Sequence, residues 1–224
     1  GSAENIRNVS SIIQNIEGGK LLVLSAMSGV TNLLVELSSN VEQGDKFKID
    51  EILEALFIRH EEEIENLFNS VEDRNEVFDI LQAELSELRN IASQEFSKEN
   101  ECRILTTGET ILTKIFSFYL TKNDISNRWL NARDFMQVAN LENPDTELVG
   151  NLLQNQLNSQ AEESIYITQG FVRINDRGEI STLNRGGSDF TATIIGAAIN
   201  AFEIQIWTDI NGLHNNDPRV VENT

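Results

Sequence analysis

Short apolar runs alternate with amphipathic helical segments along most of this chain. Leu21–Leu24, Arg128–Leu130 and Ile165–Thr168 are too short for stable helices and are expected to form strands. Apolar residues at helical spacing lie before, between and after these runs, in residues 3–16, 33–37, 109–121, 148–157 and 189–200. Strands that alternate with helices predict an α/β fold, a three-layer αβα sandwich around a mostly parallel sheet.

Further strand predictions concern the C-terminal part of the chain and residues 104–106. Residues 171–174 and 179–183 flank Asn175-Asp-Arg-Gly178, a sequence typical of a hairpin turn. Glu203–Thr208 is expected to be a last strand of the sheet. Ile104–Thr106 is expected to precede the helix near residues 109–121 as a strand would.

Residues 48–97 have a different character, because two long apolar stripes at helical spacing follow each other. They predict a helical hairpin, inserted at about residues 45–100, with a strongly acidic outer face. Such a face is typical of a solvated surface, although a binding face for another protein is the alternative.

Charge and composition exclude several classes of protein. The formal net charge of −19 argues against a nucleic-acid-binding surface, which needs a basic footprint. No apolar run approaches the length of a membrane span, so no membrane partner is expected. The single cysteine permits no internal disulfide and favours a cytoplasmic location. With two histidines it cannot build a closed zinc site, and no metal-ligating residue is predicted.

A glycine-rich turn, Asn184-Arg-Gly-Gly-Ser-Asp189, lies between a predicted strand and a predicted helix. Glycines there let the backbone approach a ligand, and the following helix N-terminus attracts anions. Ser188 or Asp189 could instead be simple helix N-caps.

Other candidate turns share this placement. Ser25–Asn32 follows one strand with hydroxyls and a glycine, but it could be only a capped turn. In Thr106-Thr-Gly-Glu109, Glu109 could complement the helix dipole or hold a substrate ammonium.

Thr208 and Asp209 end a predicted strand, where open α/β sheets bind ligands, and Arg219 could bind phosphate. Neither a Walker phosphate loop nor the protein-kinase His-Arg-Asp set is present.

Taken together, these motifs resemble those of the aspartate kinases, in the amino-acid kinase superfamily. The resemblance covers nearly the whole of residues 1–224, including the helical hairpin, and its most specific part runs from Ile165 to Arg219. It includes the following segments in the family's order: Val23–Asn32, Thr107-Gly-Glu109, Gln169-Gly-Phe171, Arg185-Gly-Gly-Ser-Asp189, Trp207-Thr-Asp209 and Asp217-Pro-Arg219.

The resemblance implies transfer of a phosphoryl group from ATP, with Mg²⁺, to the side-chain carboxylate of L-aspartate. The product, β-aspartyl phosphate, opens the biosynthesis of lysine, threonine and methionine. Such enzymes are usually homodimers. Because a carboxylate is already ionised at neutral pH, no general base is needed. Rival hypotheses are another amino-acid kinase, or a non-catalytic binding module that uses the acidic helical hairpin.

By the same resemblance, residue roles can be assigned. Arg185 would hold the substrate α-carboxylate, Glu109 its ammonium, and Asp189 would organise the catalytic groups. The aspartate pocket would be lined by Ser25, Ala26, Thr31, Phe171, Gly187 and Ser188. The nucleotide would be held by Thr208, Asp209, His214 and Arg219, although many relatives carry tyrosine where this chain has His214.

One departure from the family pattern concerns the two ends of the chain. The family begins with a strand that ends in Lys-Phe-Gly-Gly-Thr-Ser, whose lysine contacts the phosphates, and this sequence begins after such a motif. We therefore expect a catalytic domain truncated at both ends, with little activity by itself.

Overall fold

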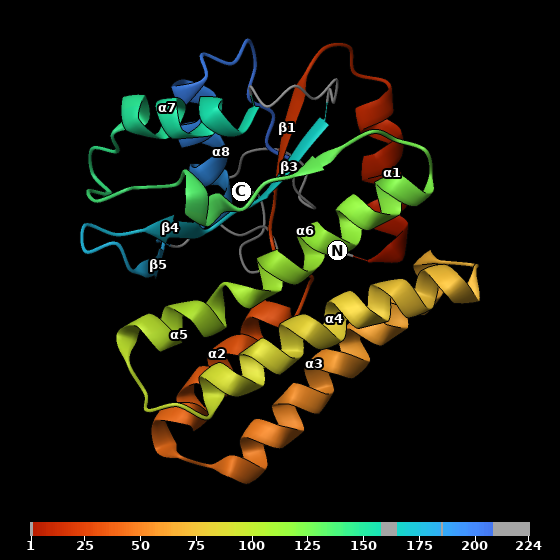
Figure 1. Cartoon of the computed structure of the whole chain (residues 1–224), viewed down its shortest axis with the longest axis vertical. Coiled ribbons are helices and arrows are strands. Elements are labelled where there is room, and N and C mark those ends of the chain that lie inside the picture. The colour runs from red at the N-terminus through yellow and green to blue at the C-terminus, as the bar shows by residue number, and fades with distance from the viewer. Residues whose placement is uncertain (1, 158–164, 185, 208–224) are drawn as a thin grey trace, which may run out of the picture.

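The computed structural model describes residues 2–157, 165–184 and 186–207. Figure 1 shows the elements that these residues form. In chain order they are α1 (Ala3–Gln14), β1 (Lys20–Leu24), α2 (Val30–Gln43), α3 (Lys46–Leu67), α4 (Val71–Ala92), α5 (Lys98–Leu105), α6 (Thr107–Lys122), β2 (Arg128–Trp129), the 3₁₀ helix η1 (Ala132–Asp134), α7 (Thr146–Leu157), β3 (Ile165–Gln169), β4 (Val172–Ile174), β5 (Ile180–Thr182) and α8 (Gly187–Ala198).

The central sheet is parallel, as the alternation of strands and helices predicts. Its strand order is β1-β3-β2, and β1 pairs with β3 from Lys20 opposite Ile165 to Leu24 opposite Gln169. β2 pairs with the other edge of β3, with Trp129 opposite Ile167. β4 and β5 form a separate antiparallel hairpin. Its Asn175–Gly178 turn closes with a hydrogen bond from the Gly178 amide to the Asn175 carbonyl (3.1 Å), as predicted.

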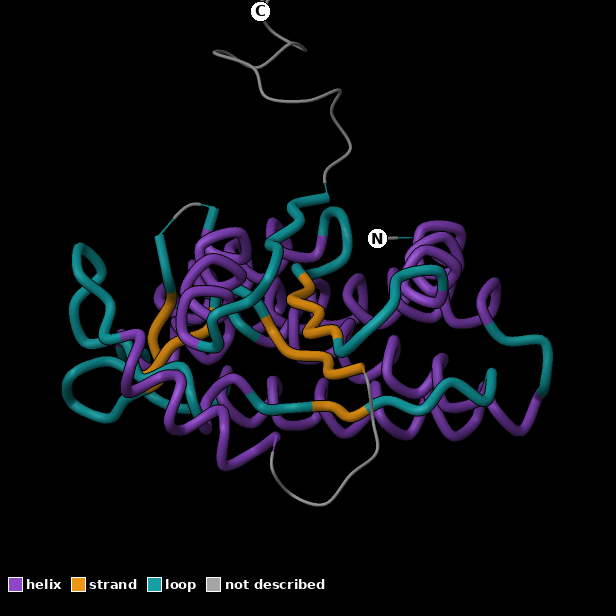
Figure 2. Tube along the Cα trace, turned by 90° about the horizontal axis from the view of Figure 1, so that it is seen from above, coloured by secondary structure: helices purple, strands orange, loops and turns teal. Residues whose placement is uncertain are grey.

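Side chains that alternate along β1 enter two different hydrophobic clusters. Leu22 and Leu24 pack against the larger cluster, which contains residues of α1, α2, α3, α4 and α6. Leu21 and Val23 pack against the smaller cluster, built from residues 130–138, α7, α8 and the β4–β5 hairpin. Because successive side chains of a strand point to opposite faces, helices cover the sheet on both sides. The predicted three-layer sandwich is therefore confirmed, and Figure 2 shows the strands flanked by helices.

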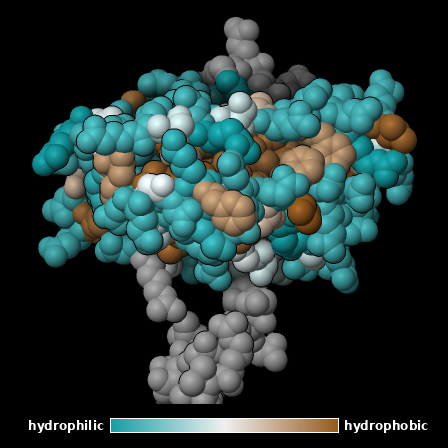
Figure 3. Space-filling model, turned by 90° about the horizontal axis from the view of Figure 1, so that it is seen from below, coloured by the Kyte–Doolittle hydropathy of each residue, from teal (hydrophilic) through white to brown (hydrophobic). Residues whose placement is uncertain are grey.

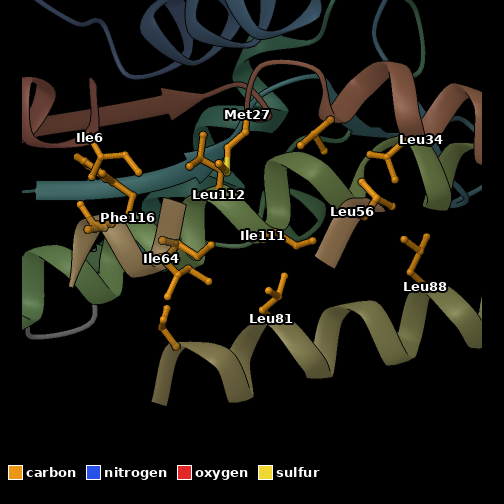
Figure 4. Packing of buried hydrophobic residues seen from close by; sticks show 14 of the residues in the cluster. Ile6, Met27, Leu34, Leu56, Ile64, Leu81, Leu88, Ile111, Leu112 and Phe116 are labelled. Atoms are coloured by element: carbon orange, nitrogen blue, oxygen red, sulfur yellow. The ribbon is translucent and has the colours of Figure 1, made fainter. Parts of the chain in front are cut away.

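The predicted helical hairpin is also present. α3 begins after Asp45, whose carboxylate accepts a hydrogen bond from the Lys48 amide (3.1 Å), and α4 begins after Ser70, whose hydroxyl caps Asp73. Leu81 and Leu88 of α4 point toward Ile111 of α6 and the residues of α3 in Figure 4. The hairpin therefore shares its core with the sheet layer. Its boundaries as an insertion, residues 45–100, stay a prediction.

The surface of the hairpin carries exposed carboxylates, as expected, among them Glu51, Glu54, Glu62, Glu65 and Glu72. Hydrophilic residues predominate on the face nearest α3 and α4, with scattered apolar side chains between them (Figure 3). Among the apolar exceptions are Phe47, Ile58 and Val71. Within the part of the chain that the structure describes, we find no helix with the length and apolar character of a membrane span.

Two strand predictions are wrong. Ile104 and Leu105 end α5, which begins at the Ser97 cap, and only Thr106 separates α5 from α6. A run this short cannot distinguish a strand from a buried helical turn, and here Cys102 and Ile104 are buried side chains of helix α5.

The second error concerns Glu203–Trp207, where no strand is assigned; Thr208 lies outside the described residues. Ile204, Ile206 and Trp207 are substantially exposed. Their alternation fits a strand, but a strand also needs a neighbouring backbone to pair with, and none of the described residues provides one. β1 is half-buried, because it lies at an edge of the described sheet.

The shared core predicts that the hairpin and the sheet unfold together. Leu81→Ala should lower the free energy of unfolding by about 2–5 kcal/mol, because Leu81 is fully buried where α4 meets α6. Urea unfolding followed by circular dichroism and by tryptophan fluorescence should give coincident transitions. Phe47→Ala, at an exposed site on α3, is the control and should change stability little. A separate early transition in Leu81→Ala would show that the hairpin unfolds independently.

Candidate active site

The candidate site lies where β1 and β3 end, because parallel strands bring their carboxyl ends to the same edge. The Gly170 amide, just past β3, donates to the carbonyl of Leu24 at the end of β1 (2.9 Å). The turn from Ser25 to Gly29 leads from β1 into α2, and the Gly170–Phe171 turn leads from β3 into β4. Both turns therefore start from the same point of the sheet, the position where open α/β folds bind ligands.

The N-terminus of α8 is packed directly against the end of β3. A Cβ atom on Gly170 would lie 2.4 Å from Ser188 Oγ and 2.8 Å from Ser188 Cα. A Cβ atom on Gly187 would lie 2.6 Å from Cδ2 of Phe171. Only glycine permits these approaches, so the two glycines bring Ser188 and Phe171 to the strand ends.

Phe171 is held in an unusual backbone conformation. Its φ of 70° is in the left-handed region, which a bulky residue rarely adopts. Its amide donates to Thr191 Oγ1 (3.0 Å), and that hydroxyl donates to the Gly187 carbonyl (2.8 Å). Its carbonyl accepts from the Leu183 amide (2.8 Å). These contacts fix the turn against α8, and such strain is typical of functional sites.

The N-terminus of α8 shows whether Ser188 or Asp189 is a simple helix N-cap. The N-cap is Gly186, with φ 77° and no side-chain cap, so neither residue is the N-cap. Ser188 is half-buried and Asp189 is exposed, both in the first turn. The helix N-terminus thus keeps uncapped amides, which suit an anion.

Glu109, in the first turn of α6, is a buried carboxylate with an incomplete set of partners. Its side chain is 4% exposed, and Oε1 accepts a hydrogen bond from the Ala26 amide (3.3 Å). Oε2 is buried and has no hydrogen-bond partner among the described residues. Burial is the main cause that raises the pKa of Glu109 to about 7, against the lowering effect of backbone hydrogen bonds. A cationic ligand group would satisfy this oxygen.

The approach of α6 to the β1 turn depends on another glycine. A Cβ atom on Gly108 would lie 2.8 Å from Ala26 Cβ and 2.9 Å from Val30 Cγ1. Gly108 therefore brings the start of α6 against the start of α2 and carries Glu109 to Ala26. This contact explains why glycine precedes Glu109 in the Thr107-Gly-Glu109 motif. The motif lies at a junction between two helices, and not after a strand as predicted.

Gln169 supports the site in a way that the sequence analysis missed. This buried side chain donates from Nε2 to Thr113 Oγ1 (3.1 Å) and accepts at Oε1 from the Ala132 amide (2.8 Å). Thr113 in turn donates to the Glu109 carbonyl (2.8 Å). Gln169 thus joins β3, the end of β2 and the helix of Glu109. The only sign of this role in the sequence is the position of Gln169 in the Gln169-Gly-Phe171 segment.

The structure brings together part of the predicted site. Ala26, Glu109, Phe171, Gly187 and Ser188 surround the ends of β1 and β3. Ser25 and Thr31 are exposed at the turn and at the start of α2. Arg185, Thr208, Asp209, His214 and Arg219 lie outside the described residues. Their roles, like those of the other site residues, stay predictions.

Comparison with known proteins gives the family. The sequence model of the amino acid kinase family matches residues 1–224. The chain belongs to this family. It is 34% identical over 206 residues to lysine-sensitive aspartokinase 3 of Escherichia coli, covering 90% of this chain and 45% of that protein. The aspartokinase of Chlamydia trachomatis is 30% identical over 228 residues, covering 100% of this chain and 49% of its own length.

Solved structures agree with this placement. Escherichia coli aspartokinase III in complex with aspartate and ADP superposes with a TM-score of 0.83 and 29% identity, over 99% of this chain and 49% of that chain. The same enzyme with lysine and aspartate gives a TM-score of 0.81 at 29% identity, over 98% of this chain and 49% of that one. The chain thus spans about half the length of the relatives it matches.

Glu109 should give the stability of this amino acid kinase a characteristic pH dependence. The pKa of Glu109 in the folded state is about 7, above the ordinary 4.5. The stabilisation that this difference gives the folded protein is therefore fully present below pH 4.5 and is lost as pH rises through 7. The loss should be on the order of 3 kcal/mol. Glu109→Gln should remove this component from urea titrations between pH 4.5 and 8.

Glu142→Gln, at an exposed loop carboxylate, is the matched control and should keep the pH dependence of the unmodified chain. An identical pH profile for Glu109→Gln would show that the Glu109 carboxyl titrates as if it were in water.

Proposed function

We propose that the protein acts as an aspartate kinase, which transfers the γ-phosphoryl group of ATP to the side-chain carboxylate of L-aspartate. The observation that carries this proposal is the buried Oε2 of Glu109, beside the Ser25–Gly29 turn, which has no hydrogen-bond partner among the described residues. In an amino acid kinase, a buried carboxylate at the strand ends is suited to an amino group of the substrate. The named relatives, aspartokinases at 34% and 30% identity, favour aspartate as that substrate.

The substrate would lie between Glu109 and the start of α8. Glu109 would accept hydrogen bonds from the α-ammonium, and Arg185 would pair with the α-carboxylate. Ser25, Ala26, Thr31, Phe171, Gly187 and Ser188 would line the pocket. This arrangement would direct the side-chain carboxylate toward the uncapped amides of α8, where the anionic phosphoryl group would be stabilised.

The chemistry requires positioning more than proton transfer. The attacking carboxylate is ionised at neutral pH, so no residue has to remove a proton from it. The amides of α8 are neutral donors and need not lose or gain a proton. Catalysis would therefore consist of alignment and stabilisation of charge on the transferring group. Asp189, exposed at the open end of the site, would organise the groups around the phosphoryl.

The nucleotide and its metal belong to the same proposal. Thr208, Asp209, His214 and Arg219 would bind ATP, in keeping with the ADP of the aspartokinase III structure. The described residues contain no group of three or more His, Cys, Asp or Glu side chains suited to a metal. Mg²⁺ usually binds through one or two carboxylates and substrate phosphates, which fits an exposed Asp189 beside ATP. Mg²⁺ would neutralise phosphate charge there. We also propose a homodimer that works in the cytoplasm.

Glu109→Gln should raise the KM for aspartate by roughly tenfold to a hundredfold in the full-length protein, because a charge-assisted hydrogen bond to the ammonium becomes a neutral one. The KM for ATP should change little. Since only ionised Glu109 pairs with the ammonium, the KM of the unmodified protein should rise as pH falls below about 7. An ATP-dependent hydroxamate assay measures both values.

In the full-length protein, Arg185→Ala should weaken the use of aspartate by roughly 2–5 kcal/mol in kcat/KM, because the substrate carboxylate loses its paired guanidinium. Arg177→Ala, in the exposed β4–β5 turn, is the control and should behave like the unmodified protein. Unchanged kinetics in Arg185→Ala would remove this residue from the site. Phosphorylation of another amino acid in preference to aspartate would refute the proposed function.

A further inference from the structure

A cavity of about 240 Å³ lies beside α6, outside the candidate active site. Its walls come from α4, α5, α6 and the segment of β2 and η1. The lining residues are Glu84, Glu87, Ile91, Arg103, Thr107, Thr110, Lys114, Trp129, Asn131 and Arg133. Its volume is several times the ~30 Å³ that a water molecule occupies in the liquid, so a phosphate or small carboxylate fits.

Helix α6 separates this cavity from Glu109. Thr107, Thr110 and Lys114 follow the spacing of one helical face and line the cavity. Glu109 lies on the far side of the same helix, where it contacts Ala26. The cavity is therefore distinct from the proposed aspartate pocket, although both adjoin the first turn of α6.

Three cations among the described residues line the cavity, and two of them are paired with carboxylates. Arg103 forms an ion pair with Glu87 (2.7 Å), and Lys114 forms one with Glu84 (2.5 Å). The Lys114 ammonium also lies 5.2 Å from the centroid of the Trp129 ring. The charges of these two cations are thus matched one to one within the wall.

Arg133 is the third cation, and its side chain has no hydrogen bond or ion pair with any residue in the described ranges. It is half-buried, and its backbone is fixed in η1, where Asn131 Oδ1 accepts from the Arg133 amide (3.2 Å). Burial, together with the positive charge of Arg103, lowers the pKa of Arg133, although Glu84, Glu87 and Asp134 act in the opposite sense. The cavity therefore holds surplus positive charge in a chain whose net charge is −19.

We propose that this cavity binds a small oxyanion, a phosphate or a carboxylate, with the guanidinium of Arg133 as its principal ligand. A guanidinium presents donors in a planar fork that matches two oxygens of either group. Arg103 and Asn131 also line the cavity and would add donors. A bound oxyanion neutralises the surplus charge that the wall leaves uncompensated. The proposal does not depend on the identity of the kinase substrate.

The test is calorimetric titration of the chain with inorganic phosphate and, separately, with succinate, at an ionic strength held constant with sodium chloride. We expect saturable binding of at least one of them, which identifies the class of oxyanion. In a Trp207→Phe background the fluorescence of Trp129 should change with the same dissociation constant, because Trp129 lines the cavity.

Arg133→Gln should bind the same anion at least about tenfold more weakly, since a bidentate charged contact is lost. Arg133→Lys should keep part of the affinity. Arg177→Gln, which removes an equal charge from an exposed turn, should bind as the unmodified chain does. Equal loss in both Gln variants, or no saturable binding of either anion to the unmodified chain, would overturn the proposal. Melting temperatures of the variants show whether each remains folded.

Discussion

The parallel pairing of β1 with β3 is the constraint on which the rest of the structure depends. It brings the two strands to a common end, where the Gly170 amide binds the Leu24 carbonyl. From this point the chain must leave in two directions, into α2 and into the β4–β5 hairpin. Glycines at positions 108, 170 and 187 then allow α6 and α8 to approach the strand ends more closely than any other residue would permit.

The same close packing explains the electrostatics of the site. Gly108 carries Glu109 against Ala26, and burial there makes the charged form of the carboxyl costly. A folded protein that keeps a buried carboxylate with one free oxygen gives up stability at neutral pH. In an enzyme this cost is recovered when a cationic substrate group arrives, so the arrangement favours a binding role over a purely structural one.

Much of the fold could be predicted from the sequence, because local patterns decide it. Leu21–Leu24 is a continuous apolar run followed by a turn, Asn175–Gly178 consists of turn residues, and the long helical stripes have a clear period. The failures occurred where local pattern is insufficient. Ile104–Thr106 is too short for its period to be defined, and Glu203–Trp207 alternates like a strand without a partner among the described residues. In the site, Gln169 was missed because its role consists of contacts with residues distant in sequence.

By itself, the sequence determined the succession of elements, the turns that carry glycine and hydroxyl groups, and the motifs that resemble the aspartate kinases. These are local properties of spacing and residue type. Only the tertiary structure decided that Glu109 is buried with one oxygen unpaired among the described residues, that Ser188 packs closely against Gly170, and that Arg133 lines a cavity beside two ion pairs. Burial and pairing depend on which distant segments pack together, and no local pattern specifies that.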